Sequence, residues 1–393
     1  MALTTLPTAA FATGSVGTSQ LADGAVTTEK LVADVNFRNL IINGDMSIAQ
    51  RGTSATTISA YDTIDRFSFS EGTGGTATSE QESLSLSDFA ITGQRKAVKI
   101  QCTGTDTSIA SGDRSFMQQS IEAQNLQSLK YGTSSAETLT LSFYAKSNLT
   151  GNFPLTIKKD DNTVYYLPLK YTITSANTWE KFTFVITPTE GSTSLITNSG
   201  GAINNDNGRG MQVIWGLVWG SNYTGNQSGT PTWTSSAIYA DNSISFNNFY
   251  SSTDNNLSIT GVQLEVGTSA SDFEFLPYDV NLQRCQRYFY QIQGSASSNT
   301  MLGIGFNNDA SSCQTYLKFP TTMRSTPSIT SYSGLQTSDG NSYTKAATGV
   351  SVDSGSNIQM SLNVQATSLT VFRGGFNTLT NSSSSHLALS SEL

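Results

Sequence analysis

The sequence predicts an all-β protein built from β-sandwiches, and two observations carry this prediction. Only 13% of the 393 residues are charged, so the polar surface consists mainly of Ser, Thr, Asn, Gln and Gly. Ser, Thr and Asn compete with the helical backbone for hydrogen bonds and suit exposed strands and turns. The second observation is a succession of segments in which apolar and polar residues alternate with a period of two, as in strands with one buried face.

Residues 1–38 are predicted to be an extended segment with a short repeat. The stretch GSVGTSQL, which begins at Gly14, returns as GAVTTEKL, which begins at Gly24. Each copy offers only a Val and a Leu for burial, too few for a core within one chain. Three chains side by side can bury these residues along a common axis. We therefore predict a homotrimer joined through Val16, Leu21, Val26 and Leu31. The alternative is a disordered leader.

Residues 39–279 are predicted to form the main domain. It opens with a short apolar strand at 40–42 and a turn signal at Asn43-Gly44. Period-two alternation then recurs in four segments, at residues 138–146, 165–171, 180–187 and 211–219. The last segment is apolar on both faces, and we expect both Trp215 and Trp219 to lie in the core. Strands with one buried face that pack in pairs form a β-sandwich.

The alternation slips by one position within residues 257–266. Leu257 and Ile259 share a face, whereas the next apolar set starts at Val262. Such a slip requires one extra residue in the strand, and Gly261 stands at the shift. We therefore predict a β-bulge at Gly261.

A short helix and a second domain follow. After Pro277, apolar residues at 282, 285, 289 and 292 fall on one helical face. This spacing predicts a connecting helix over residues 280–293. Residues 294–393 return to period-two alternation, which predicts a smaller C-terminal β-sandwich domain.

Charge and cysteine usage exclude several classes of partner. The net charge is −8, and no run of Lys and Arg provides the positive footprint that nucleic acids or anionic membranes require. No window approaches the ~18 consecutive apolar residues of a membrane span, so we predict no membrane insertion. The three cysteines are too few and too scattered for a disulfide scaffold or a zinc site.

The sequence predicts no catalytic residues and no cofactor. His386 is the only histidine, and it stands in a Ser-rich stretch. The Asp160-Asp161 pair falls between two strands, where a hairpin turn explains it, and Glu80 and Glu82 lie in a polar stretch. The oxygen-rich stretch 204–208 is a conceivable Ca²⁺ loop, but it lacks the EF-hand spacing and is better explained as a turn.

Sugar binding needs an exposed aromatic ring with amide or hydroxyl groups nearby. The predicted loop GSNYTGNQSGTPTW supplies four candidates, which are Tyr223, Asn226, Gln227 and Trp233. For Trp233 the alternatives are partial burial and a contact between subunits. In the C-terminal domain, Tyr343 and His386 are further candidates at a distal tip.

Three stretches, in this order, resemble parts of bacteriophage tail-fibre and receptor-binding virion proteins. LADGAVTTEKL, from Leu21, is similar to the DGAVT-x-x-KL repeats near fibre N-termini. NLIINGDMSIAQRGTS, from Asn39, resembles the opening of a carbohydrate-binding-module-like jelly roll. ITGVQLEVGTSASDFEFLPYDVNLQRCQRYF, from Ile259, is similar to the closing strand and exit helix of that module, with SDFE in place of ATPFE. A fourth stretch with a weaker likeness, FPTTMRSTPSIT from Phe319, is similar to part of a domain that often follows.

The resemblance implies a jelly roll over residues 39–279 in a trimeric fibre of the virion tail. We expect a non-enzymatic protein that adsorbs the virion to a glycan on the host-cell surface. Its partners would be that glycan, further copies of itself, and other phage tail proteins bound through residues 1–38. Two alternatives stay open. One is a purely architectural spacer or baseplate adaptor, and the other is a glycan depolymerase with a carboxylate pair at a subunit interface.

Overall fold

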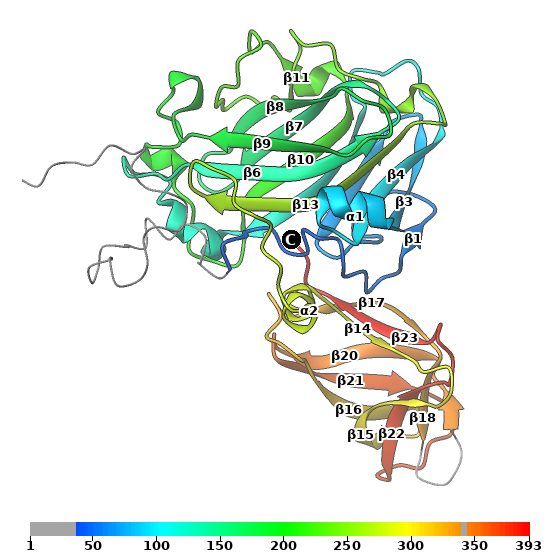
Figure 1. Cartoon of the computed structure of the whole chain (residues 1–393). Helices are drawn as coiled ribbons and strands as arrows, with labels where there is room; N and C mark the ends of the chain where they lie inside the picture. Colours follow the sequence, from blue (N-terminus) through cyan, green and yellow to red (C-terminus); the bar gives the residue numbers. More distant parts are fainter. Residues whose placement is uncertain (1–36, 339–343) are drawn as a thin grey trace, which may run out of the picture.

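The structure, a computed structural model, describes residues 37–338 and 344–393. Two β-sandwiches of unequal size are joined by helix α2 (Tyr278–Gln286) (Figure 1). This arrangement confirms the predicted all-β class with a jelly-roll sandwich. The proposed trimer residues Val16, Leu21, Val26 and Leu31 lie outside the described residues, as does Tyr343.

The larger sandwich consists of two antiparallel sheets. The six-stranded sheet contains, in spatial order, β1 (Ser54–Ala55), β3 (Thr76–Ser83), β4 (Lys96–Gly104), β13 (Asn256–Val266), β6 (Leu139–Ser147) and β9 (Glu180–Ile186). The five-stranded sheet contains β2 (Phe67–Gly72), β5 (Arg114–Glu122), β10 (Arg209–Trp219), β7 (Gly151–Lys159) and β8 (Tyr165–Ile173). Strands far apart in sequence, such as β5 and β10, pair side by side.

Short elements connect these strands. They are helix α1 (Leu86–Thr92), the 3-10 turns η3 (Ala123–Leu129), η4 (Glu190–Ser192), η5 (Ser199–Gly201), η6 (Ser221–Tyr223) and η7 (Phe249–Ser251), and the parallel pair β11 (Thr224–Gly225) and β12 (Ala240–Asp241).

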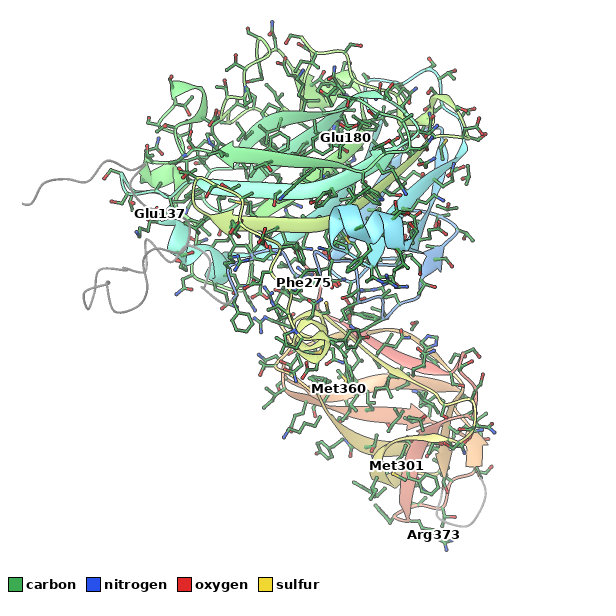
Figure 2. The ribbon with its side chains drawn as sticks, viewed as in Figure 1. Glu137, Glu180, Phe275, Met301, Met360 and Arg373 are labelled. Atoms are coloured by element: carbon green, nitrogen blue, oxygen red, sulfur yellow. The ribbon has the colours of Figure 1, made fainter. Side chains whose placement is uncertain are left out.

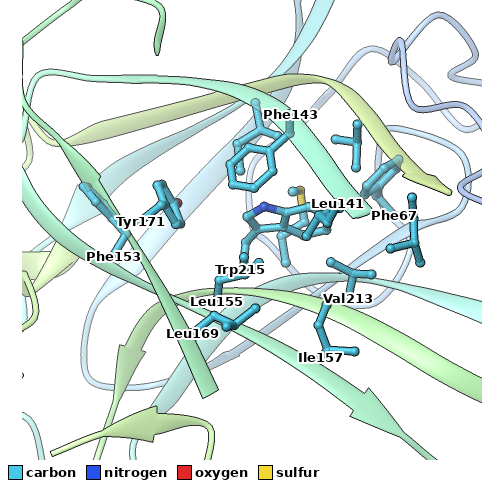
Figure 3. Close-up of a cluster of buried hydrophobic side chains, with 14 of the residues drawn as sticks. Phe67, Leu141, Phe143, Phe153, Leu155, Ile157, Leu169, Tyr171, Val213 and Trp215 are labelled. Atoms are coloured by element: carbon cyan, nitrogen blue, oxygen red, sulfur yellow. The ribbon is translucent and has the colours of Figure 1, made fainter. Parts of the chain in front are cut away.

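The core between the two sheets is centred on Trp215, whose side chain is fully buried (Figure 3). Phe143 from the opposite sheet meets the indole edge to face, with ring centroids 5.7 Å apart and an interplanar angle of 87°. Tyr171 lies edge to face against Phe143 at 5.3 Å. Aromatic pairs favour this geometry and contribute beyond the area they bury.

Strand β10 departs from the predicted alternation at one residue. Gly216 pairs with Phe116 and Val218 pairs with Ser115, so Leu217 is an extra residue that forms a β-bulge. Leu217 and Val218 both lie in the core cluster. The prediction that Trp219 belongs to the core is wrong, because the bulge turns this side chain to the outer face of the five-stranded sheet.

The predicted bulge in strand β13 is confirmed. The pairing of β13 with β6 shifts between Thr260 and Gln263. Gly261 stands at this shift with φ of 61°, in the left-handed region that favours glycine.

The smaller sandwich pairs a three-stranded sheet with a seven-stranded sheet. The three-stranded sheet contains β14 (Phe289–Gln293), β23 (His386–Ser390) and β17 (Ser328–Ser333). The seven-stranded sheet contains β19 (Thr344–Ala346), β18 (Leu335–Ser338), β22 (Gly374–Leu379), β15 (Thr300–Asp309), β16 (Ser312–Lys318), β21 (Gln359–Gln365) and β20 (Gly349–Gly355). A separate core of leucines, Met323 and Met360 fills the space between them.

The connecting helix is shorter than predicted. It ends at Gln286, and residues 289–293, expected to continue the helix, form strand β14 instead. The backbone of β14 pairs with β23 from Phe289 to Gln293, and these sheet hydrogen bonds override the apolar spacing that suggested a helix. Cys285 on the helix packs with Ile42 and Ile48 of the larger sandwich.

Two ion pairs with buried carboxylates join the sandwiches. The Arg66 guanidinium, 1% exposed, bonds the Glu392 carboxylate, donates to the Ser120 carbonyl at 2.7 Å and lies 3.4 Å from the centroid of the Tyr288 ring. Arg287 donates two hydrogen bonds to the Glu122 carboxylate, at 2.7 and 2.9 Å. Burial acts to raise the pKa of Glu122, but the hydrogen bonds from Arg287, Tyr288 and Gln124 and the positive charge of Arg287 together outweigh it and lower the pKa.

We predict that Glu392→Gln lowers the free energy of unfolding by about 3 kcal/mol, because it leaves the buried Arg66 cation without its counter-charge. Urea unfolding followed by far-UV circular dichroism measures the change. Glu80→Gln is the matched control, since Glu80 pairs with Lys99 on the surface, where an ion pair contributes roughly 0–1 kcal/mol. Equal effects of the two substitutions would contradict the role given to Arg66.

Candidate functional site

The predicted sugar-contact residues do not gather at one place. Tyr223 ends η6 above the five-stranded sheet, and Asn226 and Gln227 lie in the loop that follows β11. His386 begins β23 in the smaller sandwich. The structure therefore separates the loop candidates from the histidine.

Trp233 is corrected from a candidate sugar contact to a core residue. Its side chain is 1% exposed and belongs to the main core cluster. The indole Nε1–H donates to the Thr187 carbonyl at 3.0 Å. A sugar ring has no access to either face of this side chain.

The loop that carries Asn226 and Gln227 is folded around Asp241. The Asp241 carboxylate accepts hydrogen bonds from the main-chain N–H groups of Gln227 at 3.0 Å, Gly229 at 2.7 Å and Ser243 at 2.9 Å. Burial acts to raise the pKa of Asp241, but these hydrogen bonds outweigh it and lower the pKa. The Asn226 side chain accepts from the Ser228 N–H, so its oxygen stabilises the turn.

Five half-buried aromatic rings form a cluster on the outer face of the five-stranded sheet. We call this cluster the aromatic platform, and its members are Phe116, Tyr166, Trp219, Tyr223 and Tyr239. Trp219 stacks with Tyr239, with centroids 4.5 Å apart, and with Phe116 at 5.1 Å. Tyr166 and Tyr223 meet Tyr239 edge to face, at 5.1 and 6.0 Å.

The backbone beneath the platform explains why the rings lie there. Gly216 faces outward opposite Phe116, and a Cβ at Gly216 would lie 2.3 Å from Trp219 Nε1 and 2.7 Å from Pro154 Cγ. The glycine therefore leaves room for the indole against the sheet. The Thr156 hydroxyl donates to the Tyr239 carbonyl at 2.7 Å and fixes the segment that carries this ring.

A row of polar side chains crosses the same face beside the rings. Gln212 Nε2 donates to Gln118 Oε1 at 2.8 Å, and Lys158 Nζ donates to Gln212 Oε1 at 3.1 Å. Lys158 also pairs with Asp160 at 2.7 Å and lies 5.9 Å from the Tyr166 ring centroid. Aromatic faces next to amide, ammonium and carboxylate groups suit a ligand with both C–H faces and hydroxyl groups.

Most platform residues were missed by the sequence analysis. Tyr166 had a readable signal, because it lies in the alternating segment 165–171 next to the buried Tyr165, and neighbours on a strand point to opposite faces. Trp219 was assigned to the core because no local sequence signal marks the bulge at Leu217. Tyr239 lies 16 residues beyond Tyr223, and only the fold brings the two together.

A groove of about 590 Å³ lies between the two sandwiches, and we call it the interdomain groove. His386 lies in it and not at a distal tip, because β23 belongs to the small sheet next to the junction. Since a carbonyl only accepts, His386 Nδ1 donates to the Ser384 oxygen at 3.0 Å, and Nε2 accepts from the Ser331 hydroxyl at 3.0 Å.

Arg51 is the main cation of the interdomain groove, and its guanidinium already contacts groups of the protein itself. The Arg51 guanidinium lies 3.6 Å from the centroid of Phe289 and pairs with Glu392 at 3.1 Å and with Asp65 at 3.8 Å. These contacts hold the sandwiches together. The aromatic platform, by contrast, presents several partly exposed rings, and it is the stronger candidate for a ligand.

Two further features of the described residues bear on function. Residues 37–338 and 344–393 contain no group of three or more His, Cys, Asp and Glu placed to hold a metal ion. In the stretch considered for Ca²⁺, Asp206 accepts from the Gly208 N–H at 2.8 Å, and Asn204 donates to Asp161. Within the same described ranges, no helix has the length and apolar character to cross a membrane.

Solved structures with a partial likeness include sugar-binding proteins. A sugar-binding protein described as putative from Bacteroides thetaiotaomicron has 15% identity and a TM-score of 0.32, over 58% of this chain and 100% of that chain. The family 11 carbohydrate-binding module of cellulase Lic26A-Cel5E from Clostridium thermocellum has 11% identity and a TM-score of 0.27, over 55% and 95%. The enzymatically active domain of tailspike protein 4 of bacteriophage CBA120 has 12% identity and a TM-score of 0.28, and the match covers 58% of this chain and 22% of that chain.

At these identities and TM-scores, none of the likenesses says what this chain binds. No protein-family model matches the chain, and no curated protein matches it.

We predict that Gly216→Ala disturbs the platform without unfolding the sandwich. The added methyl group meets Trp219 Nε1 and Pro154, both on the outer face, so the indole must shift. The near-UV circular dichroism of the stacked aromatic rings is expected to change, while the far-UV spectrum stays the same. Gly112→Ala is the control, because a Cβ there meets nothing within 4 Å. An unchanged near-UV spectrum in Gly216→Ala would contradict the claim that this glycine leaves the room in which the Trp219 indole lies.

Asp65 gives the junction a pH dependence. Burial raises the pKa of Asp65 to about 6, against the opposing effects of Arg51 and the hydrogen bonds from Gln50. The folded state therefore holds this proton more tightly than the unfolded chain, whose Asp pKa is about 3.9. The resulting stabilisation is complete below about pH 4 and is lost as the pH rises through about 6.

We predict that the free energy of unfolding of the wild type falls by roughly 3 kcal/mol between about pH 4 and pH 6, and that Asp65→Asn does not show this fall. Urea unfolding at several pH values measures it. Asp254→Asn, at the surface, serves as the control and is expected to keep the wild-type dependence. A wild-type pH profile in Asp65→Asn would show that this carboxyl is not the group responsible.

Proposed function

We propose that this chain binds a glycan on a bacterial host surface through the aromatic platform, and that it serves in adsorption as a non-enzymatic tail-fibre protein of a phage virion. The observation that carries the proposal is the juxtaposition of five partly exposed rings with Gln118 and Lys158, which the buried Gln212 links by hydrogen bonds on the same sheet face. A pyranose presents C–H groups that pack on aromatic rings and hydroxyl groups that bond amide and charged side chains.

The rest of the chain fits a role in attachment. The motif LADGAVTTEKL in residues 1–38 resembles fibre attachment segments, so this part would bind other tail proteins. Several copies on one virion would then contact many glycans at once. Linked binding events raise the overall affinity far above that of a single weak contact.

We predict that Tyr166→Ala and Tyr223→Ala each weaken glycan binding by about tenfold, the effect of about 1.4 kcal/mol per lost ring contact. An array of bacterial surface polysaccharides identifies the ligand, and isothermal titration calorimetry of wild type and variants measures the affinity. Tyr144→Ala is the matched control, since Tyr144 is a half-buried tyrosine on the outer face of the six-stranded sheet.

The same experiment separates the alternatives. If the wild type binds and both platform variants bind equally well, the ligand occupies another surface. If the wild type binds no polysaccharide, the architectural spacer or adaptor becomes the better account. If new reducing ends accumulate when the protein is incubated with the bound polysaccharide, the chain is a depolymerase and the non-enzymatic proposal fails.

A further inference from the structure

We propose that the glycan bound at the aromatic platform carries a methyl-bearing substituent, and that a small apolar pocket beside Trp219 receives the methyl group. We call this pocket of about 170 Å³ the side pocket. Two substituents of sugars present such a methyl group, namely an acetyl group and the C6 methyl of a 6-deoxy sugar. The inference rests on the proposed function and adds to it the chemical class of the glycan.

The side pocket has an apolar floor and a rim that reaches solvent. Pro154, Val218 and Ala240 are buried and form its floor, whereas other lining residues are partly exposed and form its rim. The apolar members of the rim are Ile109, Trp219 and Phe246. These residues come from strands β7, β10 and β12 and from two loops, so only the fold brings them together.

The side pocket adjoins the platform through one shared indole. Trp219 stacks with Tyr239 in the platform, at 4.5 Å between centroids, and it also lines the side pocket. A Cβ at Gly216 would meet both Trp219 Nε1 and Pro154 Cγ, so the Nε1 edge of the indole lies on the side of Pro154. Because one ring borders both places, a sugar on the platform needs only a short substituent to enter the side pocket.

The side pocket is open to a ligand from outside. Strand β11, whose first residue Thr224 lines it, lies at the end of the larger sandwich remote from the smaller one (Figure 1). Figure 2 shows the side chains of that end far from Met301 and Met360, which mark the smaller sandwich. The smaller sandwich therefore leaves the side pocket uncovered.

The chemistry of the side pocket favours a methyl group over a charged or hydroxyl group. None of the described residues that line it is charged. The nearby carboxylates of Asp106 and Asp241 accept hydrogen bonds from main-chain N–H groups. A hydroxyl group that left water for this floor would lose its hydrogen bonds. An apolar cavity of about 150 Å³ stays dry and holds a ligand the size of benzene, so a methyl or acetyl group fits.

The loop that closes the side pocket is held in place by hydrogen bonds. The Asn152 side chain donates to the Ser245 carbonyl at 2.9 Å, and the Asn247 main-chain N–H donates to the Asn152 carbonyl at 3.0 Å. The Asn248 amide donates to the Asp106 carbonyl at 2.7 Å. A pocket that is already formed costs little ordering on binding, so a single methyl group has a measurable effect on affinity.

The test compares the affinity for one glycan with and without its methyl groups, by isothermal titration calorimetry. The probes are the bacterial polysaccharides bound in the array, each untreated, after mild alkali, which removes O-acetyl groups, and after chemical de-N-acetylation. Competition by L-rhamnose against L-mannose, and by L-fucose against L-galactose, tests the 6-deoxy methyl. One of these changes is expected to lower the affinity about fourfold, because a buried methyl contributes about 0.8 kcal/mol and about 1.4 kcal/mol is tenfold. The change that does so identifies the substituent, and re-N-acetylation is expected to restore an N-acetyl effect.

Variants separate the side pocket from the platform. Ile109→Ala removes part of the rim and is expected to abolish the fourfold preference for the methyl-bearing form, while the methyl-free form binds as to the wild type. Tyr166→Ala is expected to weaken binding of both forms and to keep their ratio. Ile329→Ala, at a half-buried isoleucine of the smaller sandwich, is the matched control and keeps the wild-type ratio. Thermal melting checks folding, and Phe246→Leu replaces Ile109→Ala if that variant melts early.

Two results would overturn the inference and leave the proposed function standing. One is equal affinity of the wild type for methyl-bearing and methyl-free forms, while Tyr166→Ala still weakens both. The other is a preference for the methyl-bearing form that persists in Ile109→Ala, which would place the methyl group elsewhere. A wild type that binds no polysaccharide would overturn the proposed function and this inference with it.

Discussion

Side chains on a β-strand alternate between two faces, and this constraint decides what each sheet buries and what it presents. Only an inserted residue can change the phase. The extra residue Leu217 in β10 places Trp219 outside, although Trp215 lies at the centre of the core. The extra residue Leu302 in β15 places Met301 beside Ile304. The aromatic platform therefore depends on a β-bulge, a feature that commonly re-aims side chains at functional sites.

The fold could be predicted from the sequence because its strands obey this alternation over long stretches. The bulge at Gly261 was readable as well, since a glycine and a visible slip in the apolar pattern coincide there. The bulge at Leu217 was not, because residues 211–219 are apolar on both faces and a change of phase leaves no trace. The helix over 280–293 was overextended for a related reason, as β14 gains its partner β23 from nearly a hundred residues away.

The candidate site was predictable in kind but not in its members. Composition directed attention to aromatic residues in polar loops, and Tyr223 belongs to the platform. Trp233 has similar neighbours in sequence but is buried in the main core cluster, where its indole N–H donates to the Thr187 carbonyl. The junction between the sandwiches differs from the platform, because its cations Arg51, Arg66 and Arg287 are all paired with carboxylates. Those ion pairs hold the two sandwiches together.

The most direct test of the glycan site uses the tryptophans already present. Trp215, Trp233 and Trp179 are 0%, 1% and 5% exposed, whereas Trp219 is half-buried in the platform. Acrylamide quenching of tryptophan fluorescence therefore reports mainly on Trp219. The account predicts that saturation with the bound glycan reduces quenching, and that Trp219→Phe abolishes this difference. Quenching that is unchanged at saturation would show that the glycan binds elsewhere and would contradict the assignment of the site.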